Sequence, residues 1–316
     1  MSLSISYLSP FTLSADNKVI LLKNMIAHRF LRLSLPIAMT SIIIVMLINT
    51  SLMANLNIGN QFANQWIALF YHFKKISVSQ WFSFSFYDAI ILHGTDENWL
   101  AKSISPVLWT MPIEFTGSML VFFVIFLFNQ DKKRWGIYII LALYFIYFKS
   151  YMFHFILGII ASELYVKYMQ LRDRINSFTA YNYISLGSLF ALLILYGLYG
   201  ISHLSGVVPS GLASFSIIIL CITNAKVIRF LEKPVFLFWG EICFTLYLIH
   251  LPVIFSFSSF MVIKLENLPT LYIICIVGFL TIAICLVSAW LLRFAERALM
   301  RLYKKVIVLG IYQQDH

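Results

Sequence analysis

Apolar residues dominate this chain in long continuous runs, which short polar or basic stretches separate. Such runs predict membrane-spanning helices of about 20 residues each, whereas the strands of a membrane barrel would alternate apolar and polar positions. The predicted fold class is therefore an all-α, polytopic bundle of transmembrane helices. We predict about eight spans, at residues 34–54, 107–128, 135–148, 151–168, 181–200, 207–223, 238–262 and 270–292.

The composition supports a membrane protein and argues against a nucleic-acid partner. The 316 residues are 61% hydrophobic and 11% charged, and the mean hydropathy is +0.87. The net charge of +10 comes from Lys and Arg clustered between the apolar runs, as the positive-inside rule expects of cytoplasmic loops. We therefore expect a multi-pass protein of the cell inner or plasma membrane, with the lipid bilayer as a partner and both termini cytoplasmic.

The pattern predicts a single membrane domain, residues 1–316, with no linker long enough to separate a soluble domain. Its parts outside the spans are a cytoplasmic basic segment, an external loop and a cytoplasmic tail, at residues 1–33, 55–105 and 294–316. Within the loop, residues 62–73 and 81–92 are rich in aromatic side chains but short. We expect both segments to be interfacial or re-entrant rather than spanning.

No residue pattern indicates a metal or a bound cofactor. Four cysteines lie in apolar segments without paired spacing, at Cys221, Cys243, Cys275 and Cys285. They are typical of small core residues rather than of metal ligands or disulfides. The chain also contains no glycine loop for phosphate and no nucleophile elbow.

Glu114 places a carboxylate inside an apolar run. A helix that starts near Val107 carries Glu114 about 10 Å along its axis, in or near the hydrocarbon. An ionised carboxylate there costs about 2.5 to 3.5 kcal/mol, so it must be paired, hydrated in a cavity or protonated. Glu114 is thus the leading candidate for a functional site, and a carboxylate with only a structural partner is the alternative.

Two other sets of polar residues admit more than one interpretation. Arg29 and Arg32 lie three residues apart, a spacing that suits bidentate binding of phosphate and equally suits positive-inside anchoring. In the seventh predicted span, Glu241 lies near the inner end and His250 lies near the middle. His250 could be a neutral histidine bonded within the bundle, or a general base if it faces the same cavity as Glu114.

Four motifs in this order resemble the acyltransferase-3 family of membrane O-acyltransferases. They are, in chain order, the Arg29-x-x-Arg32 pair, the Leu108–Phe115 phrase LWTMPIEF, the Leu246–Pro252 helix LYLIHLP and the terminal Arg293–Arg297 stretch RFAER. Each motif is weak alone, and the combination covers the chain from about residue 20 to 300.

The resemblance implies an acyltransferase that moves an acyl group, often acetyl, from acyl-CoA to a hydroxyl of a cell-surface carbohydrate or similar acceptor. It implies that Arg29 and Arg32 contact the phosphates of the donor. It places Glu114 in the functional cavity, with Trp109 as a candidate contact to substrate and His250 as the second catalytic candidate. Acyl-CoA is then a donor substrate rather than a resident cofactor.

The chain departs from the family pattern in one respect. The family typically has about ten spans and opens with a helix that carries an arginine and then a histidine, which is expected to supply the general base. This chain begins after that helix, so either its start lies upstream or it is a truncated and inactive member. Two other hypotheses stay open: a non-catalytic transporter or binder of carbohydrate or lipid intermediates, and an inactive partner subunit.

Overall fold

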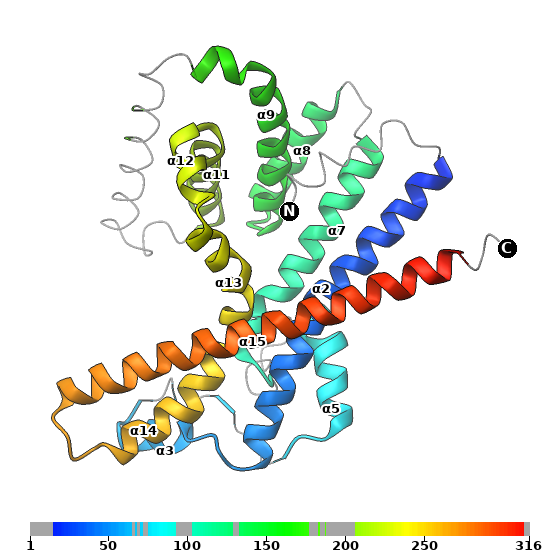
Figure 1. The fold of residues 1–316 in the computed structure, drawn as a ribbon. Coiled ribbons are helices and arrows are strands. Elements are labelled where there is room, and N and C mark those ends of the chain that lie inside the picture. The colour runs from blue at the N-terminus through cyan, green and yellow to red at the C-terminus, as the bar shows by residue number, and fades with distance from the viewer. Residues whose placement is uncertain are drawn as a thin grey trace. The chain divides into compact units, whose positions relative to one another are not determined.

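The computed structural model describes residues 15–64, 67, 70–71, 75–92, 103–128, 133–176, 183, 187 and 206–312. The predicted all-α fold is confirmed, because the elements in these residues are helices and none is a strand (Figure 1). Four helical segments are long and apolar enough to cross a membrane: Leu22–Asn49, Pro106–Phe128, Pro234–Lys264 and Thr270–Tyr303. Three shorter apolar helices match further predicted spans, and the span predicted at 181–200 lies outside the described residues apart from 183 and 187.

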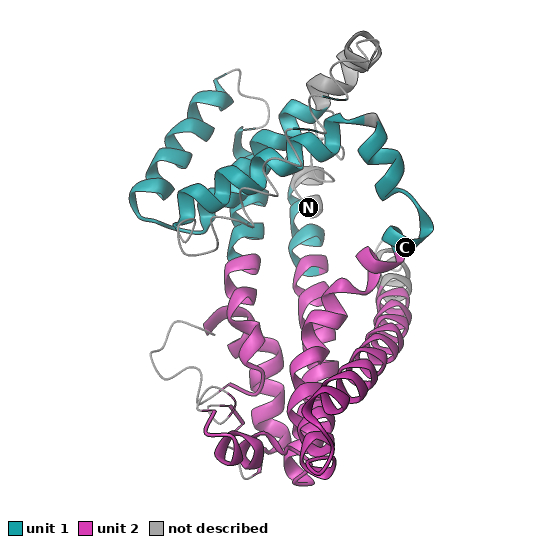
Figure 2. Cartoon of the chain, turned by 90° about the vertical axis from the view of Figure 1, so that its left-hand side faces the viewer, with its two compact units in different colours: residues 1–27, 116–237 teal, residues 28–115, 238–316 magenta. Residues whose placement is uncertain are grey.

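The chain divides into two compact units, which Figure 2 colours separately. One unit contains residues 1–27 and 116–237, and the other contains residues 28–115 and 238–316. Helices α2 (Ala15–Asn49), α7 (Met111–Phe128) and α13 (Pro234–Val253) each contribute residues to both units. The candidate site lies wholly within the second unit.

The first unit is built from α8 (Arg134–Tyr147), α9 (Met152–Asn176), α11 (Val207–Thr223) and α12 (Ala225–Leu231), with the adjoining ends of α2 and α7. Its core contains Val121, Phe122, Ile156 and Ile159, all nearly inaccessible to solvent. Arg134 and Glu163 form an ion pair of 2.8 Å between α8 and α9. Glycine at 117 lets the ring of Phe155 pack directly on the backbone of α7.

The second unit packs α2, α13 and the start of α7 with several short helices and the long helix α15 (Thr270–Tyr312). The short helices are α3 (Asn55–Gln61), α5 (Val78–Ser83), η1 (Phe84–Leu92), η2 (Pro106–Thr110), η3 (Ile254–Ser258) and α14 (Ser259–Lys264). Ile37 and Ile44 of α2 meet Ile90, Leu108 and Phe255 in its main apolar core.

Helix α2 begins at Ala15, well before the first span was expected to start. The apolar residues between the basic ones favour helix, and Pro36 is accommodated within the helix instead of in its first turn. The basic residues Arg29 and Arg32 therefore lie inside the apolar segment that starts at Leu22, not ahead of it. Likewise α15 continues to Tyr312, so most of the expected tail is helical.

The second aromatic segment of the loop packs against α2. Trp81 donates from Nε1 to the Ala38 carbonyl and to Ser41 Oγ, each at 3.1 Å, and Ser41 and Ser85 are bonded at 2.7 Å. Ile90 is fully buried. The segment therefore belongs to the core of this unit, whereas residues 93–102, which follow it, lie outside the described part of the chain.

Substituting Gly117 with Ala should destabilise the first unit. A methyl group there would lie 2.2 Å from the nearest ring atom of Phe155, so the ring must move, at a cost of about 1–3 kcal/mol. The matched control is Gly278→Ala in α15, where no atom lies within 4 Å of the added methyl group. Thermal unfolding in detergent should show a lower melting temperature for Gly117→Ala only; equal melting temperatures would contradict the packing described.

Candidate functional site

An ion pair between Arg29 and Glu114 is the centre of the candidate site. Arg29 Nη2 donates to Glu114 Oε1, and the pair links α2 to the first turn of α7. The Arg29 side chain is 9% exposed and the Glu114 side chain is 39% exposed. The partial positive charge at the N-terminus of α7 favours a carboxylate in that turn, and Arg29 gains the counter-ion that its burial requires.

The chain folds this way locally because η2 precedes α7. Pro106 begins η2, and the α-helix starts only at Met111, which places Glu114 nearer the helix N-terminus than a helix from Val107 would. Phe30 and Phe115, the residues that follow the two charged ones, pack edge to face with centroids 6.2 Å apart. Apolar packing thus holds α2 and α7 in the register that the ion pair needs.

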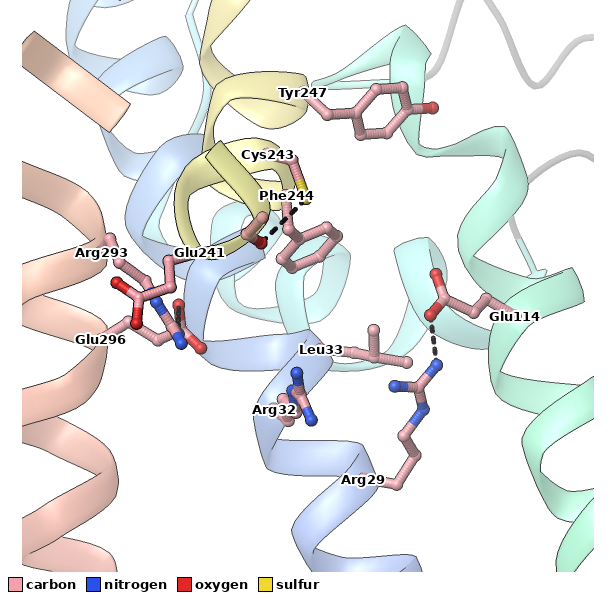
Figure 3. Close-up of a pocket in the computed structure, with 11 residues that line it drawn as sticks. Arg29, Arg32, Leu33, Glu114, Glu241, Cys243, Phe244, Tyr247, Arg293 and Glu296 are labelled. Carbon is pink, nitrogen blue, oxygen red and sulfur yellow. Dashed lines mark hydrogen bonds and ion pairs between the residues drawn. The ribbon is translucent and has the colours of Figure 1, made fainter. Parts of the chain in front are cut away.

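The ion pair lines a cavity of about 400 Å³. Its walls are Arg29, Arg32, Leu33, Glu114, Gly240, Glu241, Cys243, Phe244, Tyr247, Arg293 and Glu296. Figure 3 shows Arg29 reaching from α2 to Glu114, and Arg293 and Glu296 entering from α15. The cavity therefore brings Arg29, Arg32 and Glu114 together, three of the five residues that the sequence pointed to.

Helices α13 and α15 supply charged residues that sequence reasoning did not assign to the site. Arg293 and Glu296 form an ion pair of 2.7 Å within α15, and Glu296 is 3% exposed. Arg297 pairs with Glu241 of α13, and both side chains are partly exposed. The three-residue spacing of Arg293 and Glu296 is the signal that could have indicated the first pair.

His250 and Trp109 are not among the residues that line this cavity. His250 Nδ1 lies 2.7 Å from the carbonyl of Tyr247, one helical turn earlier. Tyr247, which does line the cavity, donates its hydroxyl to the Val107 carbonyl, and the hydroxyl lies 3.3 Å from Thr110 Oγ1. Trp109, on η2, is 43% exposed. Tyr247 and Phe244 are thus the two α13 aromatic residues on the cavity wall. Tyr247 belongs to the LYLIHLP motif, which indicated only its neighbour His250 as a site residue.

The lining indicates what the cavity can accommodate chemically. Guanidinium groups provide fixed donors for anionic oxygens, while Leu33 and Phe244 provide an apolar wall. Within the described residues, no group of three His, Cys, Asp or Glu side chains could hold a metal ion. The site combines charged, polar and apolar surface, which is typical of pockets that bind organic ligands.

Comparison with protein families gives a match over most of the chain. Residues 8–290 match the family model described as an acyltransferase domain. The chain belongs to the acyltransferase-3 family. The resemblance inferred from the four motifs is confirmed, and with its apolar helices this acyltransferase-3 protein is a membrane acyltransferase in general terms. Searches of the curated proteins and of the solved structures gave no match.

In this acyltransferase-3 protein, replacing Glu114 with Ala should destabilise the fold more than replacing Glu241 with Ala. Glu114→Ala removes an acceptor from the buried Arg29, which costs about 1–3 kcal/mol. Glu241→Ala leaves Arg297, 39% exposed, to be hydrated, at a cost of about 0–1 kcal/mol. Thermal unfolding of both variants measures the difference, and Glu114→Gln should fall between them because its amide oxygen still accepts. Equal losses for the two alanine variants would show that the Arg29 pair has no special weight.

Proposed function

We propose that this protein transfers an acyl group, expected to be acetyl, from acyl-CoA to a hydroxyl of a cell-surface carbohydrate or similar acceptor. The observation that carries the proposal is the cavity in which Arg29, Arg32 and Glu114 meet, in a member of the acyltransferase-3 family. A carboxylate and two guanidinium groups inside apolar helices are costly to insert and therefore indicate a function.

The proposed reaction is a direct acyl transfer. The acceptor hydroxyl oxygen attacks the thioester carbonyl, a C–O bond forms, and the C–S bond breaks. The hydroxyl proton passes to a base on the protein and then to the departing thiolate, which leaves as the free thiol of CoA. The tetrahedral intermediate carries an oxyanion, which nearby hydrogen-bond donors stabilise.

Within this proposal the arginines bind the donor. Arg29 and Arg32 line the same cavity and offer planar, permanently charged donors for phosphate and oxyanion oxygens. We place the helix ends that carry these arginines at the cytoplasmic face of an inner or plasma membrane, because basic clusters favour that side. Both termini are then cytoplasmic. Trp109, exposed on η2, is a proposed contact for the acceptor.

Glu114 is the proposed proton acceptor, and its position supports this role over His250. One carboxylate oxygen, Oε1, accepts from Arg29, and the side chain is partly exposed on the cavity wall. His250 retains a weaker claim, because its Nδ1 faces the Tyr247 carbonyl and it lies outside the residues that line the cavity. When Nδ1–H donates to that carbonyl, Nε2 is the basic nitrogen of a neutral imidazole.

Replacing Glu114 with Gln should lower acyl transfer by at least about 100-fold, because the amide cannot accept the hydroxyl proton. The measurement follows a radiolabelled acetyl group from acetyl-CoA into the carbohydrate fraction of membranes, per amount of folded protein. His250→Gln is the matched comparison and should retain most activity.

Each alternative gives a different result in this assay. Full activity in Glu114→Gln would remove Glu114 from the chemistry, and loss in His250→Gln alone would make His250 the base. Wild-type protein that carries a carbohydrate or lipid intermediate across vesicles without labelling it would contradict acyl transfer and favour a transporter.

A further inference from the structure

A second cavity, within the same unit, adjoins the one that contains Glu114. It has a volume of about 480 Å³ and lies between α2 and α15. Its walls are His28, Arg32, Arg293, Glu296, Arg297, Met300 and Arg301. We call it the basic cavity, because four of these residues are arginines and only one is a carboxylate.

The charges around the basic cavity are only partly balanced. Arg293 pairs with Glu296, and Arg297 pairs with Glu241. Within the part of the chain that the structure describes, Arg32 and Arg301 take part in no ion pair. Positive charge without a counter-ion thus collects around one cavity, and an anionic ligand would relieve the repulsion.

The spacing on α15 suits several anionic oxygens at once. Arg293, Arg297 and Arg301 recur every four residues, so they lie along one face of the helix. Each guanidinium presents a planar fork that matches phosphate geometry and stays charged at any physiological pH. Arg293 Nε is buried without a hydrogen-bond partner in the structure, which leaves a donor unsatisfied beside the cavity.

The two cavities are continuous in their lining. Arg32, Arg293 and Glu296 belong to both, and the pair of Glu241 with Arg297 joins a residue of the first to a residue of the second. The Glu114 cavity adds the apolar Leu33 and Phe244, whereas the lining of the basic cavity is almost entirely charged. A ligand with a less polar reactive end and a highly anionic end would match both.

We propose that the basic cavity binds the phosphate groups at the nucleotide end of the donor, with Arg297 and Arg301 of α15 acting beside Arg32 of α2. The identity of the donor rests on the proposed function. This assignment gives the two arginines of the Arg29-x-x-Arg32 motif different roles. Glu114 balances Arg29 at the reactive end, while Arg32 and the α15 arginines bind the phosphates.

The same phosphate chemistry could come from an anionic lipid headgroup, so the experiment has one arm for each source. Purified protein is placed in discs of phosphatidylcholine, and binding of adenosine 3′,5′-bisphosphate is measured by calorimetry. This probe carries phosphates and a nucleoside but no thioester, so its binding is independent of acyl transfer. The second arm adds phosphatidylglycerol to the discs and measures retained lipid by native mass spectrometry.

Substituting Arg301 with Ala should weaken binding of the bisphosphate by at least about tenfold, the loss expected when one charged hydrogen-bond donor is removed. Arg301→Lys should recover part of the affinity, because charge remains without the fork. Lys233→Ala removes an exposed cation that lines neither cavity and should leave binding unchanged. A common melting temperature for the variants excludes misfolding as the cause.

Three outcomes would overturn the proposal: no binding by the wild type, equal binding by Arg301→Ala and Lys233→Ala, or an effect of Arg301→Ala on retained phosphatidylglycerol alone. The last would assign the cavity to lipid. Failure of acyl transfer in wild-type protein that binds the bisphosphate through Arg301 would instead refute the proposed function and leave the phosphate site standing.

Discussion

The ion pair of a buried arginine with a partly exposed carboxylate, between apolar helices, is the constraint on which this structure depends. Arg29 is 9% exposed, and its burial removes hydration that only an opposite charge or water can replace. Its contact with Glu114 therefore fixes how α2 faces the start of α7. The aromatic contact of Phe30 with Phe115 sets the same register, so electrostatics and packing agree on one arrangement.

The helical class and most helices could be predicted from the sequence, because the length of a continuous apolar run indicates the length of a membrane-spanning helix. The sequence also singled out Glu114, since a carboxylate in such a run is anomalous on physical grounds. It could not predict the partner of Glu114, because 85 residues separate the pair and nothing local connects them. Helix boundaries were also missed: α2 extends through a basic stretch that resembles a loop.

The charged residues of α15 that line the two cavities show a second limit of sequence reasoning, because their contacts depend on the tertiary fold. From the sequence, Arg293 and Arg297 are typical of a basic stretch at the cytoplasmic end of a span and form part of a family motif. Neither interpretation predicts which helices they contact. The fold shows that Arg293 pairs with Glu296 and that Arg297 pairs with Glu241 of α13. Both arginines line a cavity that α2 also lines. The Arg297–Glu241 pair is partly exposed on both sides, so it contributes little stability and its main effect is to orient the two side chains.

Pro36 gives α2 a mechanical property that neither cavity reveals. Proline has no backbone N–H, so the carbonyl four residues earlier, that of Arg32, lacks its normal partner in the helix ladder. The helix is thus most easily bent just beyond its two arginines, while Ile37 and Ile44 anchor the part that follows in the apolar core. A small change of tilt at Pro36 would move both guanidinium groups together, and with them Phe30 and Leu33, so the position of the arginines is coupled to the packing of this core.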